Sequence, residues 1–163
     1  MSTDVLPGDN FKILWVDAGG IADITAPTVA ELEAGLELSY RVTRDGVEGW
    51  EAQTGNIDTT PVSSDQDTGN AGRITRSGPA LTFKKKTTSD TAYTTMVYLE
   101  EGFIVMRRYI DTSTAWTAGQ GCEVYPVQCG ETILLPKDDS RAERFKVPYT
   151  ITSRAELRAV VAA

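Results

Sequence analysis

The most informative absence from this chain of 163 residues is histidine, of which there is none. The commonest general base and the commonest metal ligand are therefore missing, and Ser-His-Asp and Cys-His catalytic arrangements are excluded. Neither a Gly-x-Gly-x-x-Gly fingerprint nor a Gly-Lys-Ser/Thr phosphate loop occurs. Neighbouring carboxylates, at 100–101 and 138–139, are interpreted as solvated, while a glycosidase pair distant along the chain stays open. We expect no enzyme, no catalytic residue, no metal and no cofactor.

Cysteine and long apolar runs are also scarce. Cys122 and Cys129 alone give too few ligands for a structural zinc site, which normally needs four. We expect two reduced, buried thiols, with a hairpin disulfide formed after release from the cell as the alternative. No apolar run approaches the roughly 20 residues that cross a bilayer. The first residues lack the basic and apolar regions of a signal peptide, so we expect folding in the cytoplasm.

The net charge of −7 is unevenly distributed along the chain. Residues 1–72 hold 13 acidic and 3 basic side chains, whereas residues 73–163 hold 10 acidic and 13 basic ones. Such asymmetry bears on association rather than on fold. Chance combined with solubility is one explanation. The other is that identical copies stack head to tail, so that an acidic surface of one copy meets a basic surface of the next.

Alternating apolar and polar residues with frequent turn signals indicate a mainly β (α+β) protein. We expect one domain over 1–163, a β-sandwich or barrel with one flanking α-helix, an N-terminal arm over 1–10 and a C-terminal arm, or short helix, over 153–163. Asp45-Gly46 predicts a turn between two strands. Pro148 predicts an edge position or a bulge for its strand. The expected strands are 11–16, 36–42, 47–58, 73–76, 80–86, 103–110, 122–127, 132–135 and 143–152, and the expected helices are 28–34 and 90–101.

Residues 59–72 form a long polar stretch without periodicity, which we interpret as a loop. A loop of this length inside a compact domain is usually functional or disordered. Asp65, Asp67, Gly69 and Asn70 faintly resemble a calcium loop, but the closing Glu of that motif is missing.

The lysine triplet at 84–86 ends a predicted strand. We interpret it as a solvated strand end that discourages edge pairing rather than as a nucleic-acid patch, because it is short and set in an acidic protein. The three tryptophans, Trp15, Trp50 and Trp116, are better explained as core or interface residues than as a sugar-binding platform.

The stretch 24–38 holds a complete helix signal followed by a strand. Thr28 and Glu31 form a capping box, Pro27 precedes it, and Gly35 supplies the stop. This run resembles the N-terminal segment of small tail tube proteins from long-tailed (siphovirus-type) phages of actinobacteria. In those proteins an Ala-Pro-Thr opening, a Glu-Leu pair, a Gly and a strand follow in the same order. The resemblance covers about 25 residues specifically and the rest of the chain only in architecture.

The resemblance implies a structural protein of the virion tail, assembled in the cytoplasm of the host bacterium. Six copies would close into a ring, and rings would stack into a hollow tube through which DNA passes without specific binding. Its partners would be further copies of itself, the tape measure protein, the tail terminator and distal tail proteins. Two alternatives stay open: a tail terminator or head–tail joining ring protein, and a carbohydrate-binding β-sandwich module.

Under the tail tube interpretation, two sets of residues are candidates for functional surfaces. The loop over 59–72 would contact the next ring, and acidic groups of the first half would face the bore, where negative charge keeps DNA from sticking. The candidate stacking residues are Asp65, Asp67, Asn70, Arg73, Arg76, Lys84, Lys85 and Lys86. The candidate lumen residues are Glu37, Glu48 and Glu51.

Overall fold

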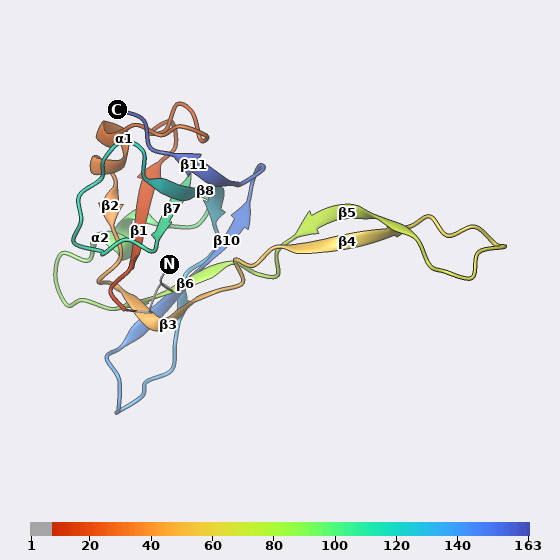
Figure 1. Cartoon of the computed structure of the whole chain (residues 1–163). Helices are drawn as coiled ribbons and strands as arrows, with labels where there is room; N and C mark the ends of the chain where they lie inside the picture. The colour runs from red at the N-terminus through yellow and green to blue at the C-terminus, as the bar shows by residue number, and fades with distance from the viewer. Residues whose placement is uncertain (1–7) are drawn as a thin grey trace.

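The computed structural model, which describes residues 8–163, is mainly β, and the predicted fold class is confirmed (Figure 1). Most strands join one curled sheet, α1 lies on its flank, and β4 and β5 form a separate ribbon that projects from the body. The predicted N-terminal arm falls largely outside the described residues. The helices and strands are β1 (Phe11–Asp17), α1 (Val29–Glu33), β2 (Leu36–Glu37), β3 (Val42–Glu48), β4 (Gln53–Asp58), β5 (Gly69–Thr75), β6 (Ala80–Lys84), α2 (Thr91–Thr95), β7 (Glu101–Arg108), β8 (Gly121–Cys129), β9 (Ile133–Leu134), β10 (Arg144–Ile151) and β11 (Glu156–Val160).

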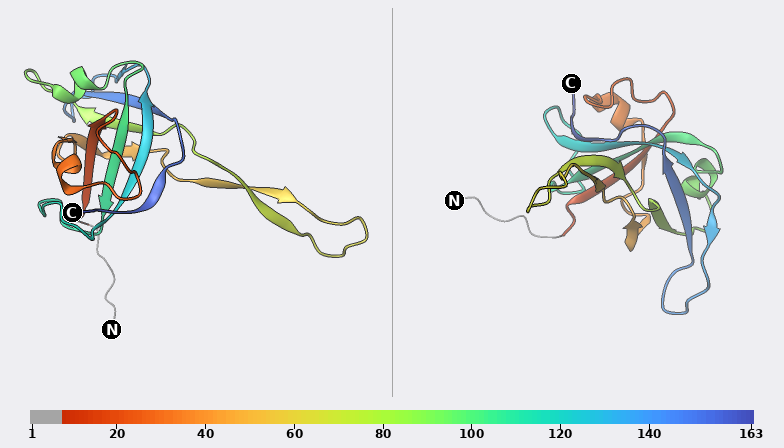
Figure 2. Two further views of the ribbon diagram at one scale, coloured as in Figure 1. Left: turned by 90° about the horizontal axis from the view of Figure 1, so that it is seen from above. Right: turned by 90° about the vertical axis from the view of Figure 1, so that its right-hand side faces the viewer.

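The main sheet has the strand order β2-β1-β7-β8-β10-β6-β3, and every pairing in it is antiparallel. Strand β10 lets the sheet curl, because its first half pairs with β6 and its last residues pair with β8. Strand β11 continues beside β8, and β9 adds a short pairing to β10. The two views in Figure 2 show the curled body with the β4–β5 ribbon extending from one side.

Both faces of the central strands are buried, so their sequences read as continuous apolar runs. On β1, Ile13 and Trp15 point into the curl of the sheet, and Leu14 and Val16 point to the opposite face. The first set joins a core with Phe83 and other residues of β6, β7, β8 and β10. The second set packs with residues of α1, β8 and the C-terminal segment.

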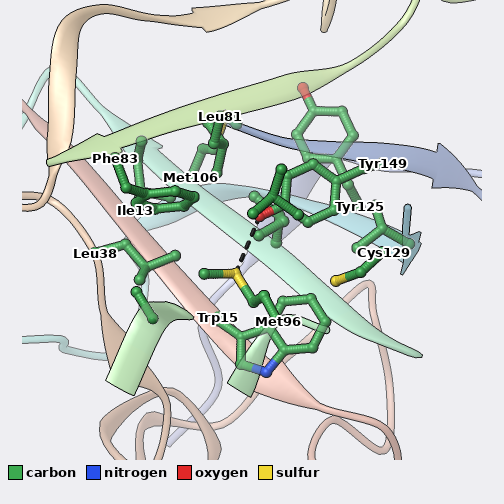
Figure 3. Close-up of a cluster of buried hydrophobic side chains, with 14 of the residues drawn as sticks. Ile13, Trp15, Leu38, Leu81, Phe83, Met96, Met106, Tyr125, Cys129 and Tyr149 are labelled. Atoms are coloured by element: carbon green, nitrogen blue, oxygen red, sulfur yellow. Dashed lines mark hydrogen bonds between the residues drawn. The ribbon is translucent and has the colours of Figure 1, made fainter. Parts of the chain in front are cut away.

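The larger core includes aromatic rings and a thioether at the entrance of β7 (Figure 3). The hydroxyl of Tyr149 donates to the sulfur of Met96 at 3.0 Å, which gives a fully buried phenol a partner. Trp50 packs edge-on against Tyr125 with ring centroids 4.9 Å apart. Gly102 is required in this core, because a Cβ there would lie 2.5 Å from the Trp15 ring and 2.5 Å from the Val16 carbonyl oxygen.

The capping box predicted at the start of α1 is confirmed. The Thr28 side chain accepts from the Glu31 backbone N–H, and the Glu31 carboxylate accepts from the Thr28 backbone N–H at 2.7 Å. The C-terminal residues hold the same turn, since the Val29 N–H donates to the Ala162 carbonyl and the Ala162 N–H donates to the Pro27 carbonyl. This helix is therefore tied to the sheet at its first turn as well as through buried Leu32.

The strand predicted over 36–42 is wrong beyond Glu37. Leu38 is buried, and its carbonyl accepts from the N–H groups of both Arg41 and Val42, which makes a turn instead of an extended chain. Alternation from Leu36 would place Tyr40 on the apolar face and Arg41 on the polar face, but Tyr40 is 67% exposed and Arg41 is buried. Local hydrogen bonding of this turn overrides the alternating pattern.

The hairpin predicted around Asp45-Gly46 is also wrong. These residues lie inside β3, where the pairing with β6 changes register between Val42 and Val47. Glycine is needed there because a Cβ at Gly46 would lie 2.7 Å from the Thr82 carbonyl oxygen. The strand predicted over 47–58 is interrupted after Glu48, and its second part pairs as β4 with β5. Only 59–68 of the predicted loop 59–72 lies outside the strands.

Three predictions in the second half need correction. The helix expected over 90–101 ends at Thr95, and Leu99 is exposed rather than packed. Pro148 lies in a strand flanked on both sides, at the point where β10 passes from β6 to β8. The segment after Ser153 forms strand β11 against β8, instead of a helix or a loose arm.

One buried network of charges ties β3, β6 and α2 together. The Asp90 carboxylate accepts from the Arg41 guanidinium at 2.5 Å, from the Lys85 ammonium at 3.3 Å, and from the backbone N–H groups of Lys86 and Tyr93. Burial raises the pKa of Asp90, but these hydrogen bonds outweigh burial and hold the pKa at about 2. The network fixes the start of α2 against the sheet.

Both cysteines are free and buried, which confirms the prediction of reduced thiols. Burial raises the pKa of Cys122 to about 11 and that of Cys129 to about 12. Neither thiol is therefore ionised near neutral pH, and both behave as small apolar side chains of the core.

Candidate assembly surfaces

The ribbon formed by β4 and β5 is the most unusual feature of the molecule (Figure 1). All residues of β4 and all but one of β5 are exposed, including Ile57 at 56% and Ile74 at 54%. Ile57 pairs opposite Asn70 and Ile74 pairs opposite Thr54, with a register shift between the two pairs. Because Thr54 and Ile57 are an odd number of residues apart on β4, Ile57 and Ile74 lie on opposite faces of the ribbon. An isolated two-stranded hairpin is at best marginally stable in water. This ribbon thus presents exposed apolar side chains without a core of its own.

The base of the ribbon is anchored where it leaves the sheet. The Trp50 indole N–H donates to the Ala80 carbonyl at 3.1 Å, and the Arg76 guanidinium donates to the Trp50 carbonyl at 3.1 Å. Gly49 and Gly78 adopt positive φ angles of 75° and 65° at the two crossings. Because glycine takes these angles without strain, the two strands can turn away from the body together.

The tip of the ribbon, 59–68, is held together by local hydrogen bonds. The Thr59 N–H donates to the Thr68 carbonyl, and the Thr60 hydroxyl bonds to both the carbonyl and the N–H of Thr68. The Asp65 and Asp67 carboxylates make no ion pair within the described residues. From 51 to 75, the span of the ribbon, the chain carries four acidic side chains and one basic one, that of Arg73, so the ribbon has a net negative charge.

A groove of about 410 Å³ lies on the body between β3, the end of β6 and the start of β10. Four cations line it, against one carboxylate, that of Asp45. The Arg141 guanidinium donates to Asp45 at 2.9 Å, and this hydrogen bond lowers the pKa of Asp45. Val42, Thr43 and Ala142 complete the lining. The cations are Arg44, Lys84, Arg141 and Arg144.

The candidate stacking residues do not form one patch. Asp65 and Asp67 lie at the ribbon tip, Asn70 and Arg73 on β5, and Arg76 at the ribbon base. The three lysines follow on the body, at and just after the end of β6. Of these, Lys85 is occupied, because its ammonium pairs with Asp90 and lies 3.8 Å from the centroid of the Tyr93 ring.

The candidate lumen residues are also dispersed. Glu37 pairs with Lys12 at 3.4 Å and accepts from the Ser39 side chain. Glu48 pairs with Lys146. Glu51 is exposed beside the ribbon base and makes no ion pair within residues 8–163. Two of the three carboxylates therefore already have a cation as neighbour.

Sequence reasoning missed several residues of these surfaces. Ile57 and Ile74 lie in stretches interpreted as a strand end and a separate short strand, and their place on one exposed ribbon depends on the pairing of β4 with β5. Arg44 is far in sequence from Arg141 and Arg144, and it meets them only because β3 and β10 lie on either side of β6. No local pattern signals either grouping.

The three tryptophans are buried, with exposures of 5% or less, as expected for core residues. This leaves no sugar-binding platform formed by them. No group of three acidic or thiol side chains with metal-binding geometry occurs within residues 8–163. No helix in that part of the chain is long and apolar enough to span a membrane.

Comparisons with known proteins identify the family of this chain. A search of curated proteins finds no match. Among solved structures, a chain in the "Cryo-EM structure of the anti-feeding prophage (AFP) baseplate, 6-fold symmetrised" has a TM-score of 0.61 at 7% identity, covering 96% of this chain and 97% of that one. A second, the "Crystal structure of Hcp protein", has a TM-score of 0.38 at 15% identity, covering 87% and 88%. The family model described as "Phage tail tube protein" matches residues 1–163. The chain belongs to the phage tail tube protein family.

Proposed function

We propose that this protein is the repeating subunit of a phage tail tube, in which six copies close into a ring and rings stack around a channel for DNA. The observation that carries this proposal is the exposed ribbon of β4 and β5, a two-stranded element that has exposed isoleucines and no core of its own. Neighbouring subunits that pack against both faces of the ribbon would bury Ile57 and Ile74. The contact would be heterologous, and heterologous contacts generate rings when they close and filaments when they do not.

Family membership and fold support the ring number and the tail location. The similar chain in the anti-feeding prophage belongs to an assembly with six-fold symmetry, which favours six copies here. The tape measure protein would occupy the channel before DNA, and terminator and distal tail proteins would close the two ends. Assembly would take place in the host bacterial cytoplasm. A long-tailed phage of actinobacteria is the proposed source, on the resemblance of residues 24–38.

The channel would carry negative charge toward the DNA. Glu51, together with Glu37 and Glu48, is our candidate for this surface. A wall with a net negative charge would repel the phosphates of passing DNA, so binding would release few counterions and the DNA would not adhere. Replacing both Glu48 and Glu51 with lysine should make assembled tubes retain a fluorescent DNA duplex, whereas unmodified tubes should not. Equal DNA retention by variant and unmodified tubes would show that Glu48 and Glu51 do not face the channel.

Negative-stain microscopy of the concentrated full-length protein tests the main proposal. Long tubes with a central channel are expected. Isolated rings that never elongate would instead favour a terminator or head–tail joining protein. Particles that stay monomeric at high concentration would contradict a tube subunit.

A pair of ribbon variants tests the contact. Ile57→Asp combined with Ile74→Asp should abolish tubes, because each carboxylate would be buried without a partner in the interface. The thermal midpoint of the unassembled subunit should not change, since both side chains are exposed there. Leu134→Asp is the matched control, because Leu134 is an exposed apolar residue of β9, outside the ribbon. Tubes formed normally by the ribbon variant would show that no neighbouring subunit covers Ile57 and Ile74.

A further inference from the structure

The basic groove between β3, β6 and β10 has three cations that nothing in the subunit neutralises. Arg141 is paired with Asp45, but the side chains of Arg44, Lys84 and Arg144 make no ion pair or hydrogen bond within the described residues. The pKa of Asp138 is lowered by its hydrogen bonds with Ser140 and, further, by the charges of Arg141 and Arg144, but Asp138 makes no ion pair with either. The groove therefore keeps a positive excess for a partner.

The tip of the ribbon has the complementary features. Asp65 and Asp67 are exposed carboxylates without a cation, and Val62 between them and β4 is fully exposed. Val42 and Ala142 give the groove an apolar lining that suits Val62. Opposite charges around an apolar contact are the arrangement that steers an association and fixes its register.

The tip does not reach the groove of its own chain. The ribbon continues from the end of β3, and it points away from the body and from the loop before β10 (Figures 1 and 2). From Gln53 to Thr60 it extends roughly 25 Å at about 3.3 Å per residue, which is enough to bridge to an adjacent copy. The acidic tip and the basic groove of one chain are thus available to two different neighbours.

We propose that the acidic tip at 59–68 of one copy docks into the basic groove of Arg44, Lys84 and Arg144 on a second copy. This inference rests on the proposed tube function and names the surface that receives the ribbon. Because the donor and acceptor surfaces differ, the contact repeats without end. Each copy gives a tip to one neighbour and accepts a tip from another.

A second cleft, at the base of the ribbon, is less suited to this role. It contains Arg154 and Arg158, but also the Glu156 side chain, and its third cation, Arg76, is held by the Trp50 carbonyl. The ribbon of the same chain forms one wall of this cleft through Ile74. It therefore has less uncompensated charge than the groove.

Charge exchange between the two surfaces tests the docking. Asp65→Lys with Asp67→Lys should reduce the mass of pelleted tubes by about tenfold or more, because like charges would then face each other. Arg44→Glu with Arg144→Glu should have the same effect. Copies that carry all four substitutions should recover most of the tube mass. Lys137→Glu is the matched control, since Lys137 is an exposed cation outside the groove and should leave assembly unchanged.

Cross-linking gives an independent readout. A chain with Asp67→Cys and Arg144→Cys should form a ladder of covalent oligomers longer than dimers under oxidation, whereas each single variant should stop at dimers. The native cysteines are buried and do not compete.

The outcomes separate this inference from the proposed function. If the unmodified chain forms tubes and both charge-reversed variants form them equally well, the docking is wrong and the tube function stands. The same holds if the double cysteine variant gives no ladder. A third outcome is that Arg154→Glu with Arg158→Glu restores tubes to the tip variant, while the groove substitutions do not. That result would place the tip in the second cleft and would also overturn the proposed docking. An unmodified chain that forms no tube or ring would contradict the function itself.

Discussion

Replacing Asp90 with asparagine removes one negative charge from the buried network and keeps the shape of the side chain. The carboxylate is 8% exposed and accepts from two cations and two backbone N–H groups. Its pKa of about 2 lies below the ordinary value of 3.8. At roughly 1.4 kcal/mol per pKa unit, this difference contributes about 2 kcal/mol to the free energy of unfolding at pH 7.

The sign of the pH dependence follows from the direction of the pKa shift. A depressed folded-state pKa stabilises the fold fully above the unfolded value of 3.8, and the contribution disappears as pH falls toward 2. About half of it should remain at pH 3. Asp90→Asn should therefore destabilise the subunit by about 2 kcal/mol at pH 7 and by about 1 kcal/mol less at pH 3.

Urea unfolding of the full-length chain measures this effect, at a concentration below that of assembly and at both pH values. The dependence of the free energy on urea should not change, since the same surface is exposed on unfolding. Asp139→Asn is the control, because that carboxylate is 94% exposed and pairs only loosely with Lys137. A loss at pH 7 below about 0.5 kcal/mol, or the same loss at both pH values, would refute an ionised, paired Asp90.

Three further predictions concern the fold. Gly102→Ala should destabilise the subunit by about 2 kcal/mol or more in denaturant titrations, because its Cβ overlaps the Trp15 ring and a backbone oxygen; an unchanged midpoint would mean that β7 can shift. Thr28→Ala should lower the free energy of unfolding by about 1 kcal/mol through loss of the helix cap. If tube formation survives this substitution as well as the fold does, α1 has only a structural role within the subunit. Cys122 and Cys129 should react with iodoacetamide only on unfolding, given their raised pKa values and burial; fast labelling of the folded subunit would contradict this.

The sequence by itself determined the elements whose signals are local. The capping box of α1 depends on side chains three residues apart, so Thr28 and Glu31 identified it correctly. The apolar strand at β1 and the buried, reduced state of the cysteines followed from composition in the same way. The mainly β class followed from turn frequency and alternation, and the short run 24–38 pointed to the family that the whole chain matches.

Only the tertiary structure decided which strands pair and which faces are exposed. The hairpin expected at Asp45-Gly46 failed because β3 pairs with β6, a strand more than 30 residues later, and the local turn signal became a bulge. The polar stretch from 59 onward became the tip of a ribbon because Gly69 and its successors pair with β4. The basic groove arose in the same manner, since Arg44 and Arg144 are 100 residues apart and meet across β6. Contacts between residues so distant in sequence depend on how the sheet curls, and no local periodicity of the sequence encodes them.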